Sequence, residues 1–311
     1  MNILENIPQR QIKHLVVSGG SIWGITGFGI LSQAIDCGFL NMEDIESIYA
    51  TSAGSIITSM LALKIDHKTI YYYLLKRPWE SIFKQNKYSF LEMYQQKGMF
   101  HKGFIEKLFL PLLHTVELST NITLKEFYEF NHIDLHIYTT ELNEFKSIDL
   151  SYQTHPDWRL IDAIYASCSV PFFFSPIIIE NACYVDGALL VGYPISKCLE
   201  KVENTNEIFG ISLGNHKLKD ETVKYTAIDN SSNIFEIVST VLNKTLHKKD
   251  ITQYNASHVR YQIHCLQNTT LENCMNAIYN REYRDFLLSD GVARMKESCV
   301  QWFSHTIDEL N

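Results

Sequence analysis

Two successive strand-turn-helix units near the N-terminus constrain the fold of this chain most strongly. Residues 14–18 form a short apolar run, a glycine-rich turn follows, and apolar residues then recur with helical spacing to about residue 34. The same order returns at 45–63, where a β-like run meets a turn of small residues and then a helical stretch. Consecutive units of this kind predict a parallel sheet with helices on its faces.

Strand-like and helix-like segments continue to alternate along the chain. Their patterns predict a helix at 160–166 and strands at 134–140, 177–185, 207–212 and 260–265. From about residue 235 onward the spacing of apolar residues is mainly helical. We therefore expect an α/β fold with three layers, α/β/α, a mainly parallel central sheet and a helical C-terminal extension.

The composition favours a globular protein and argues against nucleic acid as a partner, against a metal site and against a membrane-spanning segment. Of the 311 residues, 46% are hydrophobic and 20% charged, and the net charge of −8 comes with dispersed basic residues, so nucleic acid is not an expected partner. The seven cysteines are odd in number and lack metal-ligand spacing, which predicts reduced thiols and no metal site. No signal peptide or apolar run long enough to span a membrane is visible, so we expect a cytoplasmic location.

Two serines compete for the role of an activated nucleophile. A serine hydroxyl on a sharp strand-to-helix turn needs small neighbours two positions away, hence the pattern G-x-S-x-G. Ser212 has the complete pattern within 210–214, but a polar segment without helical periodicity follows it. Ser52 lies between a predicted strand and a predicted helix, and we prefer it for that reason. Its expected nucleophile elbow consists of Ala50, Thr51, Ser52, Ala53 and Gly54.

Each of these local signals also has a simpler interpretation. A serine before a helix is commonly an N-cap. The first glycine turn, Gly19, Gly20 and Ser21, is a candidate oxyanion hole because its backbone N–H groups are unobstructed, but it is also compatible with an ordinary tight turn. Its spacing does not match a nucleotide-binding G-x-G-x-x-G, and no Walker lysine follows.

Taken together, the segments resemble the patatin-like phospholipase family. Members share a glycine-rich oxyanion loop, a nucleophile elbow and a later Asp-Gly-Gly or Asp-Gly-Ala segment, which is present here as Val185-Asp-Gly-Ala188. The stretch 163–176, with small residues, proline and aromatics, also fits, as do 98–103, 139–143, 192–194 and 211–214. The resemblance implies an N-terminal extension at 1–12, a catalytic core at 13–215 and a mainly helical part at 216–311 packed on the same domain.

The resemblance implies a lipid acyl hydrolase of the phospholipase A or esterase type, without cofactor or metal. Asp186 would take the Ser52 proton directly, with no histidine, and water would hydrolyse the resulting acyl-enzyme. A useful base requires a partly desolvated Asp186. Ser21 stands where the family usually has glycine, and a serine is tolerable there with a negative φ. Trp23 stands where the family commonly has arginine or lysine, so the loss of that cation is expected to weaken the binding of anions or to change the substrate preference.

Two alternatives remain from the sequence. A Ser-His-Asp triad would need a late histidine, and the candidates are His216, His247, His258 and His264. A lipid-binding or scaffolding protein that has lost turnover is the other, and the changes in the oxyanion loop favour it. The expected partners are a lipid ester substrate and, transiently, a membrane surface or lipid aggregate. The sequence does not predict an oligomeric state.

Overall fold

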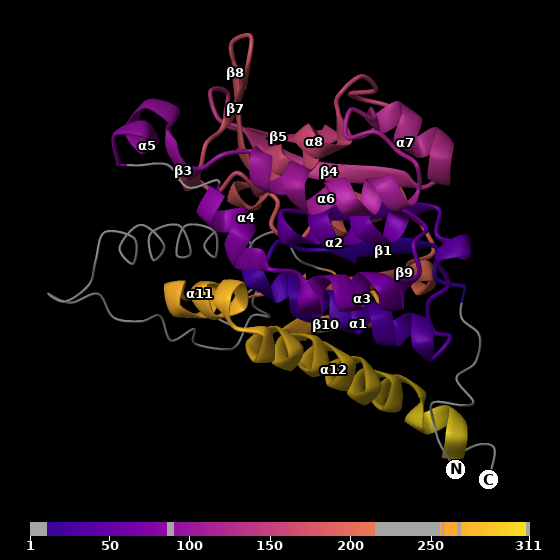
Figure 1. Ribbon diagram of the computed structural model, residues 1–311. Helices are drawn as coiled ribbons and strands as arrows, with labels where there is room; N and C mark the ends of the chain where they lie inside the picture. Colours follow the sequence, from indigo (N-terminus) through magenta and orange to yellow (C-terminus); the bar gives the residue numbers. More distant parts are fainter. Residues whose placement is uncertain (1–10, 86–89, 215–255, 257, 266–268, 309–311) are drawn as a thin grey trace, which may run out of the picture.

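The computed structural model describes residues 11–85, 90–214, 256, 258–265 and 269–308 (Figure 1). Residues 1–10 of the predicted N-terminal extension and all of 215–255, including His216 and His247, lie outside the described residues. The strands are β1 (His14–Val17), β2 (Ser47–Thr51), β3 (Gly98–Phe100), β4 (Asp134–Glu141), β5 (Lys146–Leu150), β6 (Phe172–Phe174), β7 (Ile177–Ile179), β8 (Ala182–Asp186), β9 (Ile208–Leu213) and β10 (Tyr261–Cys265).

Helices lie between these strands and follow the last one. They are α1 (Gly24–Asp36), α2 (Ala53–Ala62), α3 (His67–Lys76), α4 (Trp79–Gln85), α5 (Phe90–Gln96), α6 (Gly103–Thr115), α7 (Leu124–Asn131), α8 (Leu160–Cys168), α9 (Ile195–Leu199), α11 (Leu271–Tyr279) and α12 (Arg281–Asp308). Two short 3₁₀ turns border the candidate site, η2 (Ser21–Trp23) and η4 (Gly187–Leu189). Figure 1 shows α12 running along α1 beneath the sheet.

The central sheet has the strand order β10-β9-β1-β2-β4-β8-β7, and β5 also pairs with β4. The five strands from β10 to β4 are parallel to one another, whereas β5, β7 and β8 pair antiparallel. The prediction of an α/β fold with a mainly parallel sheet is therefore confirmed. The run at 177–185, which we expected to be one strand, forms the hairpin β7–β8 with a turn at Glu180 and Asn181.

The sheet is buried on both faces, as its apolar sequences require. Successive residues of a strand point to opposite faces, so Leu15 and Val17 pack in the large core beneath α1 and α2, while Val16 faces a smaller core. The smaller core also contains Ile195 and Cys198 of α9. Helices on both faces make the three layers that the sequence predicts.

One edge of β4 brings the ends of two other strands together. β2 pairs with β4 up to Thr51 opposite Tyr138, and β8 pairs with it from Asp186 opposite Thr139. β5 occupies the other edge of β4, because Ile137 and Tyr138 pair with both β2 and β5. β2 and β8 therefore meet end to end along β4, although 134 residues separate Ser52 from Asp186.

Candidate active site

Ser52 lies at the apex of a sharp turn from β2 into α2. Its backbone has φ 50° and ψ −124°, a conformation that L-residues rarely adopt and that tight functional turns impose. Ser52 occupies the N-cap position of α2, but its side chain makes no capping hydrogen bond, so capping does not engage its hydroxyl. Gly54 must be small here, because a Cβ atom at this position would lie 2.5 Å from the carbonyl oxygen of Val17.

The Ser52 hydroxyl donates a hydrogen bond to the Asp186 carboxylate. The distance from Ser52 Oγ to Asp186 Oδ2 is 2.7 Å, and the second oxygen, Oδ1, accepts from the backbone N–H of Ala188 at 2.8 Å. Gly187 permits this turn, since a Cβ atom there would lie 2.1 Å from the Tyr138 carbonyl oxygen. The hydroxyl and the carboxylate thus form a directly bonded pair.

Burial changes the acidity of Asp186. The residue is 3% exposed and Ser52 is 8% exposed, so the carboxylate has little contact with water. Desolvation raises the pKa of Asp186 to about 6, against the opposing hydrogen bonds from Ala188 and Ser52. Burial and the nearby Asp186 carboxylate also raise the pKa of the Cys168 thiol, which keeps this neighbouring sulfur protonated at neutral pH. A carboxylate with a pKa near neutrality has the basicity that proton abstraction requires.

Ser167 and Ser169 support the pair, and the sequence analysis did not identify them. Ser167 Oγ accepts from the Ser52 backbone N–H at 2.8 Å and donates to the Tyr138 carbonyl at 2.6 Å. The Ser169 carbonyl accepts from the Asp186 N–H at 2.9 Å. The small residues of 163–176 were noted from the resemblance alone, because their hydrogen bonds are tertiary contacts, and the one from Ser52 to Ser167 joins residues 115 positions apart.

The loop at 19–21 lies beside the turn of Ser52, with one difference from expectation. A Cβ atom on Gly19 would lie 3.2 Å from the Ser52 Cβ, so the loop and the serine are in close contact. The Gly19 N–H, however, donates to the Gly192 carbonyl at 2.9 Å, and in this conformation it is not available to a substrate oxygen. The described part of the chain provides no acceptor for the Gly20 and Ser21 amides.

Residues 21 and 23, where the sequence departs from the family pattern, have surroundings that the sequence did not reveal. Ser21 has φ 52°, so the negative φ under which a serine would be readily tolerated there is not present, and the residue occupies a region that favours glycine. Its hydroxyl lies 3.9 Å from the Cys274 sulfur of α11, which connects the loop to the C-terminal helices. Trp23 is 5% exposed and packs in the large core, so its side chain does not face the pair.

The rival candidates lie away from Ser52. Ser212 is fully buried inside β9, and its hydroxyl has no partner among the described residues. His264 lies in β10, three strand positions from β2, which corresponds to about 14 Å at the usual spacing of strands. His258 precedes the same strand, and no described contact joins it to Ser52. Neither described histidine is placed to take the Ser52 proton.

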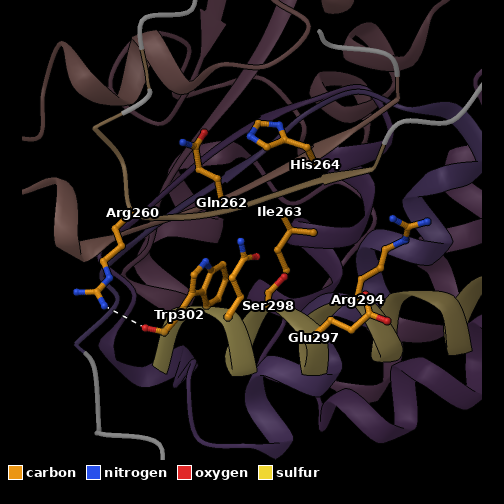
Figure 2. Close-up of a pocket in the computed structure, with 9 residues that line it drawn as sticks. Arg260, Gln262, Ile263, His264, Arg294, Glu297, Ser298 and Trp302 are labelled. Carbon is orange, nitrogen blue, oxygen red and sulfur yellow. Dashed lines mark hydrogen bonds between the residues drawn. The ribbon is translucent and has the colours of Figure 1, made fainter. Parts of the chain in front are cut away.

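A cavity of about 660 Å³ lies between β10 and α12, away from Ser52 (Figure 2). Figure 2 shows Arg260, His264, Arg294 and Trp302 around it, and Arg260 donates to the Trp302 carbonyl at 3.0 Å. His264, a candidate for the alternative triad, lines this cavity, whereas Ser52, Asp186 and the loop at 19–21 do not. Among the described residues, no group of three or more His, Cys, Asp or Glu side chains is arranged to hold a metal ion.

Comparison with known proteins identifies the family to which this chain belongs. The family model described as "Patatin-like phospholipase" matches residues 15–199, more than half of the chain. The chain belongs to this family. Both Ser52 and Asp186 lie inside the matched region, as do the loop at 19–21 and the supporting serines of 163–176.

Two curated relatives come from viruses. The chain is 24% identical to an uncharacterized protein of Acanthamoeba polyphaga mimivirus over 302 residues, which cover 97% of this chain and 98% of the relative. It is 25% identical over 202 residues to a probable lipid hydrolase of Invertebrate iridescent virus 6, covering 65% of this chain and 68% of the relative. The first of these relatives matches the chain almost from end to end.

Solved structures share the fold. VipD from Legionella pneumophila superposes with a TM-score of 0.51 at 14% identity, covering 94% of this chain and 67% of VipD. ExoU, in its heterodimeric complex with SpcU from Pseudomonas aeruginosa, gives 0.51 at 13% identity, covering 95% of this chain and 52% of that chain. This chain therefore spans about half the length of ExoU. These likenesses support the α/β architecture.

Proposed function

We propose that the protein is a lipid acyl hydrolase in which Ser52 is the nucleophile and Asp186 the general base. The observation that carries the proposal is the 2.7 Å hydrogen bond between the strained serine and a buried carboxylate whose pKa is raised to about 6. Family membership and the name of one viral relative, a probable lipid hydrolase, support a lipid ester as substrate. The pairing of β9 with β10 supports a single domain that includes 13–215 and the described part of 216–311.

The chemistry follows from the positions of the two side chains. Asp186 takes the hydroxyl proton while Ser52 Oγ attacks the ester carbonyl carbon, giving a tetrahedral intermediate with a negative oxygen. The N-terminus of α2 and the amides of Gly20 and Ser21 are the donors we assign to that oxygen. Collapse breaks the bond to the alcohol, which leaves with the proton from Asp186. Asp186 then activates water to hydrolyse the acyl-enzyme.

A covalent probe tests this assignment. A fluorophosphonate should label Ser52 of the native chain, and Ser52→Ala should abolish both the label and the release of fatty acid from a panel of phospholipids and neutral lipids. Ser212→Ala is the matched control, since it removes the other elbow-like serine and should keep both signals. Activity that a chelator abolishes, or a label at another serine, contradicts the proposal.

The scaffold alternative has one observation in its favour, because the Gly19 amide is already engaged by Gly192. A catalytically inactive lipid-binding protein on this fold would leave Ser52 unlabelled by the same probe while still binding lipid. The labelling experiment therefore separates the two functions in one measurement.

A further inference from the structure

The β7–β8 hairpin and the β4–β5 turn project from the sheet at the edge where Ser52 lies. Tyr184 of β8 pairs with Glu141, the last residue of β4, so the rest of the hairpin extends beyond the carboxyl ends of the parallel strands. Figure 1 shows the hairpin standing clear of the body of the molecule. The two turns are therefore prominent features of the edge that carries Ser52 and Asp186.

Apolar side chains are exposed on both projections. Ile178 is 54% exposed, Ile179 is 41% exposed, and Leu142 in the β4–β5 turn is 43% exposed. Neighbouring residues of a strand point to opposite faces, so the exposure of both isoleucines means that neither face of β7 is covered there. A group of large apolar side chains exposed together marks a contact surface, whereas a single exposed side chain does not.

Exposed apolar side chains also lie on the neighbouring segments β6 and α5. β6 begins three residues after Ser169, the residue whose carbonyl accepts from the Asp186 N–H, and it pairs with β3. α5 packs beside β3. Phe172 of β6 is 49% exposed, and Leu91 and Tyr94 of α5 are 66% and 81% exposed. We call these side chains the apolar rim: Leu91, Tyr94, Leu142, Phe172, Ile178 and Ile179.

Hydrogen bonds hold the two projections together. Asn143 Nδ2 in the β4–β5 turn donates to the Asn181 carbonyl in the β7–β8 turn at 2.6 Å. The buried Glu141 carboxylate accepts from three backbone N–H groups, two in the first turn at 3.0 and 2.7 Å and one, that of Cys183, at 3.1 Å. The two turns that carry Leu142, Ile178 and Ile179 are thus positioned before the rim meets a partner, so docking orders few additional groups there.

The charges around the rim are nearly balanced. The segments 90–97, 142–146, 172–174 and 177–182 contain three carboxylates, Glu92, Glu144 and Glu180, and two ammonium groups, Lys97 and Lys146, which leaves a net charge of −1. Lys146 and Glu144 form an ion pair with each other. Since the whole chain carries −8, an anionic partner would be repelled, and the rim suits an electrically neutral surface.

We propose that the apolar rim docks the protein on the surface of an electrically neutral lipid bilayer. The proposal rests on the lipid hydrolase function above, because docking at this edge brings Ser52 towards the lipid esters. Phe172 is three residues from Ser169, whose carbonyl holds the Asp186 N–H, so the rim and the proposed dyad share one short segment. The bilayer would take the rim side chains into its interfacial region, as it does those of peripheral proteins.

Vesicle binding tests the proposal. The full chain carrying Ser52→Ala, which leaves the lipid intact, is sedimented with phosphatidylcholine vesicles. We expect binding that does not change between about 0.1 and 0.5 M salt, because charge is not the driving force. Ile178→Ser together with Ile179→Ser should weaken the partition coefficient at least about tenfold. The matched control replaces Phe286 and Val300 of α12, 58% and 43% exposed, with serine and should bind as the parent does.

Several outcomes overturn the docking proposal. The proposal fails if the chain does not bind phosphatidylcholine vesicles or binds vesicles only when they contain anionic lipid. It also fails if the rim and control variants lose vesicle binding equally, or if light scattering shows that the native chain is a dimer and the rim variant a monomer. Equal thermal midpoints of the variants exclude unfolding as the cause of a loss. Vesicle binding by a chain whose Ser52 resists the fluorophosphonate leaves the docking surface standing and contradicts only the proposed catalysis.

Discussion

Asp186→Asn should stabilise the protein at neutral pH while abolishing its activity. The native carboxylate has a pKa of about 6, above its ordinary value of 3.8, because burial disfavours the charged form. Between these values the native state binds more protons than the unfolded state, so the free energy of unfolding falls as pH rises from about 4 to 6 and stays lower above that. A difference of about two pH units corresponds to about 3 kcal/mol.

The asparagine removes this penalty and keeps most of the hydrogen bonds. Its Oδ1 can accept from the Ala188 N–H and its amide can donate to Ser52 Oγ, where the native distances are 2.8 and 2.7 Å. The second amide proton has no acceptor opposite it in the native arrangement and costs about 1 to 2 kcal/mol. We therefore expect a net gain of about 1 to 2 kcal/mol at pH 8 and a net loss of about 1 kcal/mol at pH 4, where the native carboxyl is already protonated and only the cost of the unpaired amide proton remains.

Urea unfolding followed by tryptophan fluorescence at a series of pH values between 4 and 8 measures this difference. Asp157→Asn, at an exposed position, is the control for removing one negative charge from the chain. The reasoning is refuted by an Asp186→Asn protein that is no more stable than the native chain at pH 8. A gain of equal size at pH 4 and pH 8, or an equal gain for the control, also refutes it.

Three further predictions concern the same site. Ser167→Ala leaves the buried Ser52 N–H without a partner and should lower the free energy of unfolding by about 1 to 3 kcal/mol in urea titrations, whereas Ser59→Ala, at a buried hydroxyl with no partner among the described residues, should not lower it. The kcat/KM for a soluble ester should rise with pH through about 6 and level off above, as Asp186 loses its proton, and a rate that falls across this range contradicts its role as base. Gly54→Ala should destabilise the protein by about 1 to 3 kcal/mol, because the methyl group would meet a β1 carbonyl, and an unchanged urea midpoint would count against that geometry.

The fold and the turn at Ser52 were accessible from the sequence because their signals are local. The apolar runs of β1 and β2, and the helical spacing after each, lie within 50 residues of the chain. The preference for Ser52 over Ser212 used only the order of strand, turn and helix. Both depend on periodicities that a single segment carries, which is why they were predicted with correct element types and ends within a few residues.

The arrangement of the loop at 19–21 was not accessible in the same way. The bond from the Gly19 N–H to Gly192 joins residues 173 positions apart, and no local pattern encodes it. The positive φ of Ser21 and the burial of Trp23 depend on how η2 packs against distant elements, including α11. Tertiary packing decides these features. The resemblance led us to expect Trp23 at the site, whereas its side chain lies in the core.

The meeting of β2 and β8 along one edge of β4 has a consequence for synthesis. A ribosome releases Ser52 well before it has made β4, and Asp186 follows 134 residues after the serine. Until β4 has paired with both strands, Ser52 lacks the base that we propose for it. A nascent or prematurely terminated chain that ends before Asp186 would therefore lack the proposed base, and the proposed hydrolysis requires that β8 has already paired with β4.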